Sequence, residues 1–228
     1  MYCNFRQKWL ILGVKNADAI QQGPIQDSYR SISDVSEGLF KDRGSRFIAY
    51  AYPICAESQV KPLVDALKKE HHGARHHCFA YRIGCDGSVW RANDDGEPSS
   101  SAGKPILGAI DSAGLSDVLV VVVRYFGGIL LGVPGLVRAY RQAAADALEK
   151  AAVVEKTATK RFLLEFDYLN MNEVQTFLKA FDVQVLESRF DLRCEVTLAV
   201  RLSLEEKFID KINNINNEKC TCIQCRPL

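Results

Sequence analysis

The strongest constraint on the fold is an unbroken aliphatic run in the middle of the chain. Val118–Val123 contains five valines and one leucine, with no polar residue among them. β-Branched residues favour strands, and a strand with one solvated face would alternate apolar and polar side chains. The run therefore predicts a strand that is buried on both faces.

The segments around this run predict a mixed α+β domain. Helical spacing of apolar residues indicates one helix over 57–71, with Pro62 tolerated near its first turn, and another that begins near Pro134 and ends near Ala152. A helix containing Ile106, Leu107 and Ile110 is expected after the loop 94–101. Extended segments are predicted at the ranges 31–40, 47–54, 76–83 and 88–91.

The last third of the chain has a different pattern. After a polar joint at 155–159, Phe162, Leu164 and Phe166 alternate with polar residues, as in a strand with one solvated face. A helix, two further strands, a second helix and a closing strand near 220–224 are then predicted. This order is the split-βαβ, ferredoxin-like (βαββαβ) order, which predicts a small domain over 157–228.

Composition narrows the function and the environment. The 228 residues include 29 basic and 28 acidic side chains, so net charge does not indicate a general nucleic-acid binder, although a local basic patch remains open. No stretch reaches the roughly 18 apolar residues of a membrane span. The first 27 residues read as a loosely ordered leader. Eight scattered cysteines favour reduced thiols, and we expect a cytoplasmic protein without a membrane partner.

A glycine turn follows the buried strand and is the most specific local motif. It comprises Arg124, Tyr125, Phe126, Gly127 and Gly128. An arginine at the end of an apolar strand is costly to bury, so it either emerges at the surface or pairs with an acidic group. Paired glycines allow close approach of a ligand or of another chain segment. No nucleotide-binding glycine pattern is present, and a purely structural turn is the alternative.

A second motif is the acidic loop that contains Asp94, Asp95, Gly96, Glu97 and Pro98. Its carboxylates could hold Mg²⁺, pair with arginines, or form a solvated turn. The serines that follow are good helix caps, and the amides at that helix start could bind an anion. We expect no bound cofactor.

Histidine and cysteine residues form two further clusters. His76 and His77 should point to opposite faces of a strand, so packing and hydrogen bonding by His76, with Cys78 on the same face, is favoured over a shared metal ion. Cys220, Cys222 and Cys225 are compact enough to bind a metal. Because only three thiols are local, strand packing is the simpler interpretation.

Four ordered motifs resemble the IMPACT family, specifically its bacterial YigZ branch. They are HHCFAYR at 76–82 in the order H-x-C-x-A-Y-R, DDGEP followed by AGKPIL, VVVVRYFGG, and GLVRAY. The resemblance covers about residues 30–155. It implies a ribosomal protein S5 domain 2-like first domain, placed here at 28–156, and a ferredoxin-like second domain. Both folds are shared with consecutive C-terminal domains of elongation factor G.

The resemblance also implies a class of function. Eukaryotic members regulate translation under amino-acid stress by binding a partner protein. The chain departs from the family pattern at Leu130, where a lysine is usual, and this removes a phosphate-capable charge beside Arg124. Lys104, Arg138 and Arg141 could still join Arg124 in a local basic patch, and a solvated helix face is the alternative.

Two function classes follow from these motifs, beside a plain protein-interaction module with no nucleic-acid role. The first is a translation-associated regulator, not an enzyme, that binds the ribosome, structured RNA or a translation-regulatory protein, with no DNA partner expected. Its surface would comprise the two motif loops, with His76 and the basic residues named above. The alternative is a metal- or anion-dependent enzyme in which the acidic loop and the glycine turn form two walls of a cleft.

Overall fold

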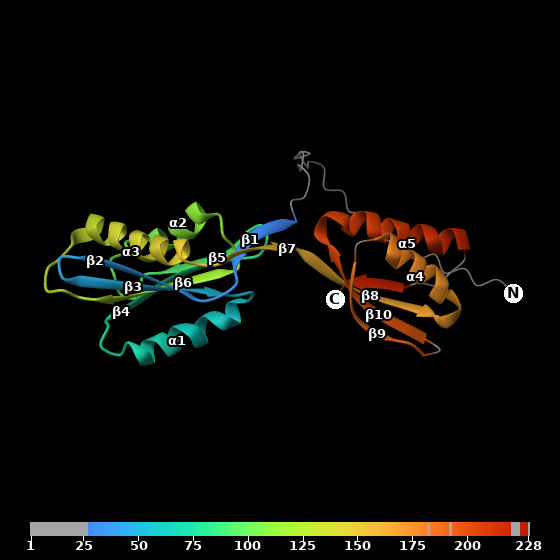
Figure 1. The fold of residues 1–228 in the computed structure, drawn as a ribbon, viewed down its shortest axis with the longest axis horizontal. Coiled ribbons are helices and arrows are strands. Elements are labelled where there is room, and N and C mark those ends of the chain that lie inside the picture. Colours follow the sequence, from blue (N-terminus) through green and yellow to red (C-terminus); the bar gives the residue numbers. More distant parts are fainter. Residues whose placement is uncertain (1–26, 182, 192, 220–223, 228) are drawn as a thin grey trace, which may run out of the picture.

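Two multi-stranded sheets, each with its own hydrophobic core, carry most of the chain (Figure 1). The structure is a computed structural model, and it describes residues 27–181, 183–191, 193–219 and 224–227. The predicted leader therefore lies outside the described residues, apart from Asp27. In the described part of the chain, no helix is long and apolar enough to cross a bilayer.

The first sheet has five strands, and every neighbouring pair is antiparallel. Its order is β2-β3-β6-β4-β5. The strands are β2 (Ser36–Asp42), β3 (Ser45–Pro53), β6 (Val118–Tyr125), β4 (His76–Ile83) and β5 (Val89–Asn93). The aliphatic run therefore occupies the centre of the sheet, where neighbours satisfy its backbone on both sides.

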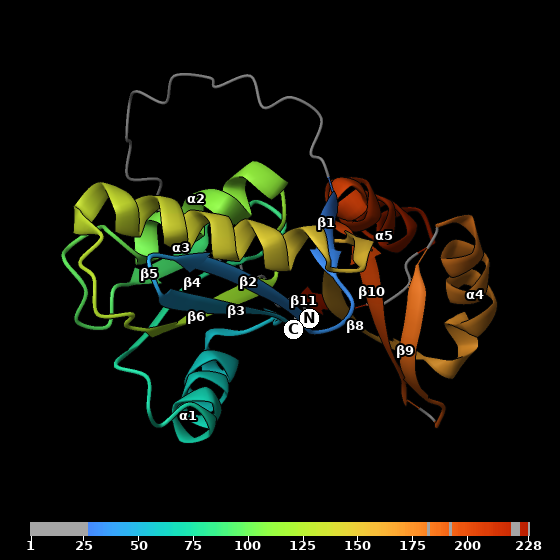
Figure 2. The ribbon, with the colours of Figure 1, turned by 60° about the vertical axis from the view of Figure 1, so that its left-hand side comes forward.

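Both faces of β6 are covered, as the sequence predicted. Val118, Val120 and Val122 pack into a core with α2 (Gly103–Ala113) and α3 (Gly132–Glu149). Leu119, Val121 and Val123 pack into a second core with α1 (Val60–Glu70). Figures 1 and 2 show α1 on the opposite side of the sheet from α2 and α3. Each buried aliphatic side chain contributes about 1.5–3 kcal/mol.

The single strand predicted over 31–40 is wrong in one respect, because the structure divides this range between two strands that belong to different sheets. Residues before the exposed bend form β1 (Ser28–Ile32), which pairs with β7 (Val153–Thr157) in a separate two-stranded ribbon. β7 overlaps the predicted polar joint. A charged ribbon strand lacks a hydrophobic period, so the sequence carried no signal for it.

Asp117 anchors this ribbon to the first sheet. Its buried carboxylate accepts hydrogen bonds from Tyr29 Oη at 2.6 Å and from the Gly84 amide at 3.0 Å, and lies 3.3 Å from Lys156 Nζ. The Asp117 carboxylate thus contacts both strands of the ribbon and the β4–β5 turn. Burial, together with the Asp117 hydrogen bond, raises the pKa of Tyr29 above its ordinary value.

The second sheet has four antiparallel strands in the order β11-β8-β10-β9. Its elements are β8 (Thr159–Asp167), α4 (Met171–Ala180), β9 (Gln184–Arg189), β10 (Arg193–Arg201), α5 (Glu205–Lys219) and β11 (Gln224–Pro227). Phe162, Phe177 and Phe208 meet in its core, so both helices pack on one face of the sheet. The element order agrees with the predicted order.

Candidate functional site

Most of the residues singled out from the sequence gather at one end of the first sheet. β6 ends there at Tyr125, β4 begins there at His76, and β5 ends there before the acidic loop. The tight β2–β3 turn reaches the same end, since Gly44 lies against Gly127. α2 and α3 also begin there. In Figure 1 this is the end of the sheet farthest from the second sheet.

Arg124 forms a buried ion pair with Glu97. The Arg124 Nη1–Glu97 Oε1 distance is 2.6 Å, and the two side chains are 8% and 4% exposed. The guanidinium lies 5.5 Å from the ring centroid of Phe47 and 5.7 Å from that of Phe126. Of the two outcomes that the sequence left open, Arg124 therefore takes the acidic partner. The buried Arg124 side chain can therefore position its neighbours, but it is not exposed for contact with a binding partner.

The same carboxylate connects Arg124 to α3. Tyr140 Oη donates to Glu97 Oε1 at 2.7 Å, and Cys78 Sγ lies 3.3 Å from Tyr140 Oη. Burial raises the pKa of the Cys78 thiol well above its usual value, and also that of the Tyr140 hydroxyl. The thiol therefore stays protonated, which argues against a nucleophilic role for Cys78.

Asp94 caps the first turn of α2 from outside the helix. Its Oδ1 accepts the amides of Ala102 at 3.0 Å and Gly103 at 2.8 Å, and its Oδ2 accepts that of Ser100 at 2.8 Å. The expected serine cap is wrong, since Ser101 Oγ donates to the Pro98 carbonyl oxygen. An ionised carboxylate suits free amides at a helix start better than a hydroxyl does.

This capping makes stability depend on pH. Burial raises the pKa of Asp94, but its three backbone hydrogen bonds lower that pKa by a larger amount. The pKa of Asp94 in the folded state therefore lies below the ordinary value. The contribution is then complete above about pH 4, where an unfolded aspartate ionises, and is lost as pH falls through the lower folded-state pKa. We expect Asp94→Ala to cost about 1–2 kcal/mol at pH 7 in urea unfolding, and progressively less below pH ~4. A difference from wild type that stays constant down to pH ~2 would contradict this reading.

The remaining acidic side chain of this loop, Asp95, is also engaged. Its Oδ2 accepts the His77 amide at 2.7 Å, and its Oδ1 lies 3.2 Å from Lys68 Nζ. All three carboxylates of the motif thus serve protein partners. Within the described ranges, no group of three or more potential metal ligands is found. These contacts engage each of the three carboxylates that a metal-dependent site at this loop would use as ligands.

His76 and His77 lie on opposite faces of β4, as predicted. The His76 Nδ1 bonds the Asp95 carbonyl oxygen at 2.9 Å, and its Nε2 lies 4.0 Å from Glu97 Oε1. His77 is buried on the α1 side, and burial lowers its pKa. Cys78 packs on the face covered by α2 and α3. Cys220 and Cys222 lie outside the described residues, as does the side chain of Cys225.

The surface at this end is apolar, and most of it escaped sequence reasoning. The connection between β6 and α3, together with the first two residues of α3, is called here the apolar loop (residues 126–133). It exposes Phe126, Ile129, Leu130 and Val133. Leu130 is 80% exposed and the other three are about half exposed, at 51%, 54% and 49%. The available signal was Phe126 within the glycine turn and Ile129, Leu130 and Val133 after it, a set of apolar residues in a segment read as a turn.

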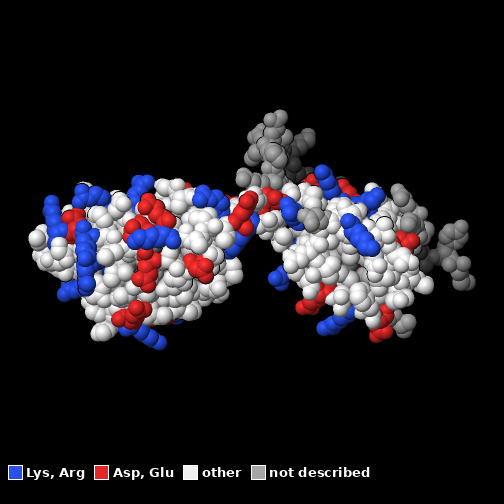
Figure 3. Space-filling view, in the orientation of Figure 1, with Lys and Arg blue, Asp and Glu red and all other residues white. Residues whose placement is uncertain are grey.

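Exposed basic side chains lie beside the apolar loop. Lys41, Arg43 and Arg46 come from the β2–β3 hairpin, and the Arg46 guanidinium lies 5.0 Å from the Tyr125 ring centroid. Figure 3 shows basic side chains gathered at this end of the molecule. None of these three was singled out from the sequence. Only the contact between the β2–β3 turn and Gly127 in the folded structure brings the hairpin next to the glycine turn.

The predicted basic patch is only partly assembled. Arg124 is buried, and Arg138 Nη2 lies 2.6 Å from Asp42 Oδ2. Arg141 donates to Ser112 Oγ at 3.2 Å on the outer surface of the two helices. Lys104 is exposed near the start of α2. The basic character of this end therefore comes more from the hairpin than from α3.

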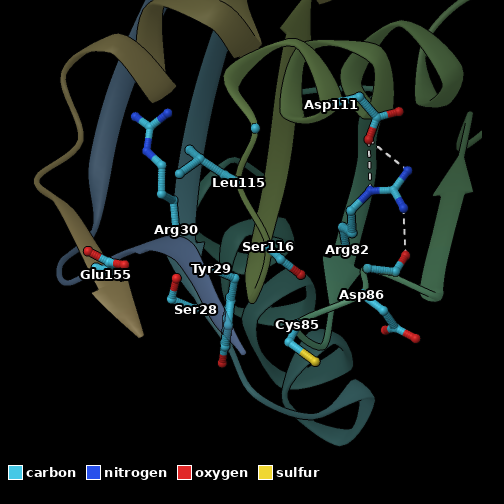
Figure 4. Close-up of a pocket in the computed structure, with 12 residues that line it drawn as sticks. Ser28, Tyr29, Arg30, Arg82, Cys85, Asp86, Asp111, Leu115, Ser116 and Glu155 are labelled. Atoms are coloured by element: carbon cyan, nitrogen blue, oxygen red, sulfur yellow. Dashed lines mark hydrogen bonds and ion pairs between the residues drawn. The ribbon is translucent and has the colours of Figure 1, made fainter. Parts of the chain in front are cut away.

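A cavity of about 560 Å³ lies away from the motif loops, between β1, the β4–β5 turn and the end of α2 (Figure 4). Arg82 borders it, but its guanidinium is held by Asp111 at 2.7 Å and by the Gly87 carbonyl oxygen at 2.5 Å. The Arg82 guanidinium is thus engaged by protein groups, and the other charged side chains of the lining include Arg30 and Glu155 from the β1–β7 ribbon. Sequence reasoning did not find it, because its walls come from four separate segments.

Comparison with known proteins identifies relatives over most of the chain. The model of the Impact N-terminal domain matches residues 43–148. The IMPACT family member YvyE of Bacillus subtilis is 31% identical, over 84% of this chain and 88% of its own. The IMPACT family member YigZ of Escherichia coli is 36% identical, over 69% of this chain and 78% of its own.

A solved structure is also similar. The crystal structure of a hypothetical protein superposes with a TM-score of 0.66 at 28% identity, covering 90% of this chain and 98% of that one. The likeness therefore includes residues after 148, where the domain model ends, and extends into the second sheet.

Proposed function

Since the chain belongs to the IMPACT family, we propose that it is a translation-associated regulator that acts by binding, without turnover, through the motif-bearing end of its first sheet. The ribosome, structured RNA and a translation-regulatory protein are the candidate partners. The observation that carries the proposal is the exposure of the apolar loop at the place where the family motifs converge. A contiguous patch of exposed apolar residues on a folded protein commonly marks an interaction site.

The buried groups beneath the loop support the same conclusion. Glu97 joins Arg124 on β6 to Tyr140 on α3, and these two elements flank the apolar loop. Such a network holds both loop ends in one geometry, which lowers the entropy lost when a partner binds. The motif residues are accordingly assigned to positioning, and the exposed apolar and basic side chains to contact.

We also assign the two sheets to two domains, 28–156 and 157–228. The order β11-β8-β10-β9, with a helix after the first and third strands in sequence, is the order of a ferredoxin-like sheet. For the first sheet, the family resemblance supports a ribosomal protein S5 domain 2-like fold. The family resemblance also implies a fold likeness to elongation factor G, which agrees by analogy with a role in translation.

Co-sedimentation with ribosomes tests the proposal. We expect the purified chain to pellet with ribosomes at low salt and to be released as salt rises, because Lys41, Arg43 and Arg46 contribute screened electrostatic attraction. Leu130→Ser should reduce the bound fraction about tenfold or more, since it removes the most exposed apolar contact. Arg124→Ala is unsuitable here, because it would disturb a buried ion pair.

Leu169→Ser is the matched control. Leu169 is 91% exposed and lies beside the second sheet, so its replacement removes a leucine elsewhere that is even more exposed than Leu130. Binding that falls equally in both variants would contradict the assignment to the apolar loop. A wild-type chain that stays in the supernatant at low salt would exclude direct ribosome binding.

A further inference from the structure

The strand β9 forms an open edge of the second sheet. It pairs with β10 on one side, and in the described part of the chain no strand lies on its other side. All six of its residues are exposed. An edge strand presents a row of backbone donors and acceptors that can pair with another strand.

The register with β10 tells which face each side chain of β9 occupies. Ser188 is opposite Val196, which belongs to the core under the helices. Glu187 and Arg189, its neighbours, therefore project from the face without helices. Among the described residues, neither one makes an ion pair. The register shift lies before Glu187, so the part of β9 from Glu187 to Arg189 is regular.

We propose that two copies of this chain associate by antiparallel pairing of their β9 edges about a twofold axis at Ser188. In that register, Glu187 lies opposite Arg189 of the second copy, and the symmetry repeats the pair. In the same register, Leu186 at the register shift lies at the level of Phe190 of the second copy, the residue that directly follows β9. These two are 38% and 57% exposed in the single chain. Opposite charges and apolar pairs directly across two strands both stabilise pairing.

Self-complementarity selects this register over its neighbours. Directly opposed side chains share a face, so the twofold axis of such a pair must pass through a residue. An axis at Glu187 places Val185 opposite Arg189, and an axis at Arg189 places Glu187 opposite Asp191. Only the axis at Ser188, of these three, brings opposite charges together and also brings apolar side chains together. It joins four strands from each copy into one sheet, with the helices of both copies on one side.

Charge reversal tests the pairing in the full-length chain by sedimentation equilibrium over about 1 µM to 1 mM, a range that covers weak association. We expect wild type to dimerise. Glu187→Arg and Arg189→Glu should each raise the dissociation constant about tenfold or more, because each single variant opposes like charges twice. The double variant Glu187→Arg/Arg189→Glu should dimerise again, since both pairs are restored in reverse.

Mixing the two single variants provides an independent check. One single variant carries two arginines at these positions and the other carries two glutamates, so a mixed dimer has opposite charges throughout. We expect the mixture to associate more strongly than either variant alone. A wild type that is monomeric up to about 1 mM overturns the proposal, as do dimers that persist unchanged in both single variants. The result does not depend on ribosome binding, which involves the first sheet.

Discussion

Replacing Glu97 with alanine is expected to destabilise the first sheet and its helices by about 3–5 kcal/mol. The substitution leaves the Arg124 guanidinium buried without its counter-charge, and the Nε of Arg124 already has no partner among the described residues. It also removes the acceptor of Tyr140 Oη. Loss of one member of a buried pair costs more than the pair contributes, because the remaining charge cannot reach water.

Urea unfolding followed by Trp90 fluorescence measures this cost. Trp90 lies on β5 of the first sheet, and Trp9 is replaced by phenylalanine in every variant so that one tryptophan reports. Asp42→Ala is the control: it removes the Asp42–Arg138 pair, whose arginine side chain is 68% exposed, and should cost about 1 kcal/mol or less. Equal costs for Glu97→Ala and Asp42→Ala would sink the prediction.

A double variant separates the lost charge pair from lost packing. Glu97→Gln/Arg124→Met removes both charges, keeps similar volumes and leaves an amide oxygen that can accept from Tyr140. It should recover at least half of the stability lost in Glu97→Ala, because no unpaired charge stays buried. A double variant no more stable than Glu97→Ala would place the effect in packing instead.

Gly127→Ala is expected to cost about 3 kcal/mol, the upper part of the range for overpacking. A Cβ at this position would lie 2.0 Å from the Gly44 carbonyl carbon and 2.2 Å from the Ser45 amide nitrogen. Both are backbone atoms of the β2–β3 turn, so the turn itself must move. Gly44 has a φ of +79°, which few other residues adopt, so the turn has little room to adjust.

The matched control for this variant is Gly108→Ala in α2. No atom lies within 4 Å of a Cβ built there, and alanine favours a helix interior by up to about 1 kcal/mol over glycine. The same urea unfolding assay compares the two variants. We further expect Gly127→Ala to weaken ribosome binding, because the hairpin arginines and the apolar loop meet at this contact. Equal stability of the two alanine variants would contradict the predicted clash.

The site was only partly predictable from the sequence. The motifs identified Arg124, Glu97 and Asp94, but their roles depend on partners 6 to 43 positions away along the chain. Because burying an unpaired arginine costs free energy, the sequence left two possibilities for Arg124: exposure at the surface or pairing with an acidic group. Only the position of Glu97 in the structure decided between them. Leu130 was noted as a missing lysine, whereas the structure gives it a role of its own as the most exposed residue of the apolar loop.

The sequence by itself determined the elements whose side chains repeat with a clear period. The run Val118–Val123 has no polar face, so it could lie only in the middle of a covered sheet, and the alternation along β8 and β10 required one buried face. The family was also readable, because four motifs keep their order and spacing. Such features are local, and they follow from the apolar area that each segment must bury.

Tertiary structure alone decided the features that rest on a meeting of distant segments. The ribbon of β1 and β7, the Arg124–Glu97 ion pair and the contact of Gly44 with Gly127 each join parts of the chain that no local pattern connects. The open edge of β9 likewise exists only because the strand order places it last. The physical reason is that hydrogen bonds, ion pairs and backbone clashes act over a few ångströms in space, whatever the separation in sequence.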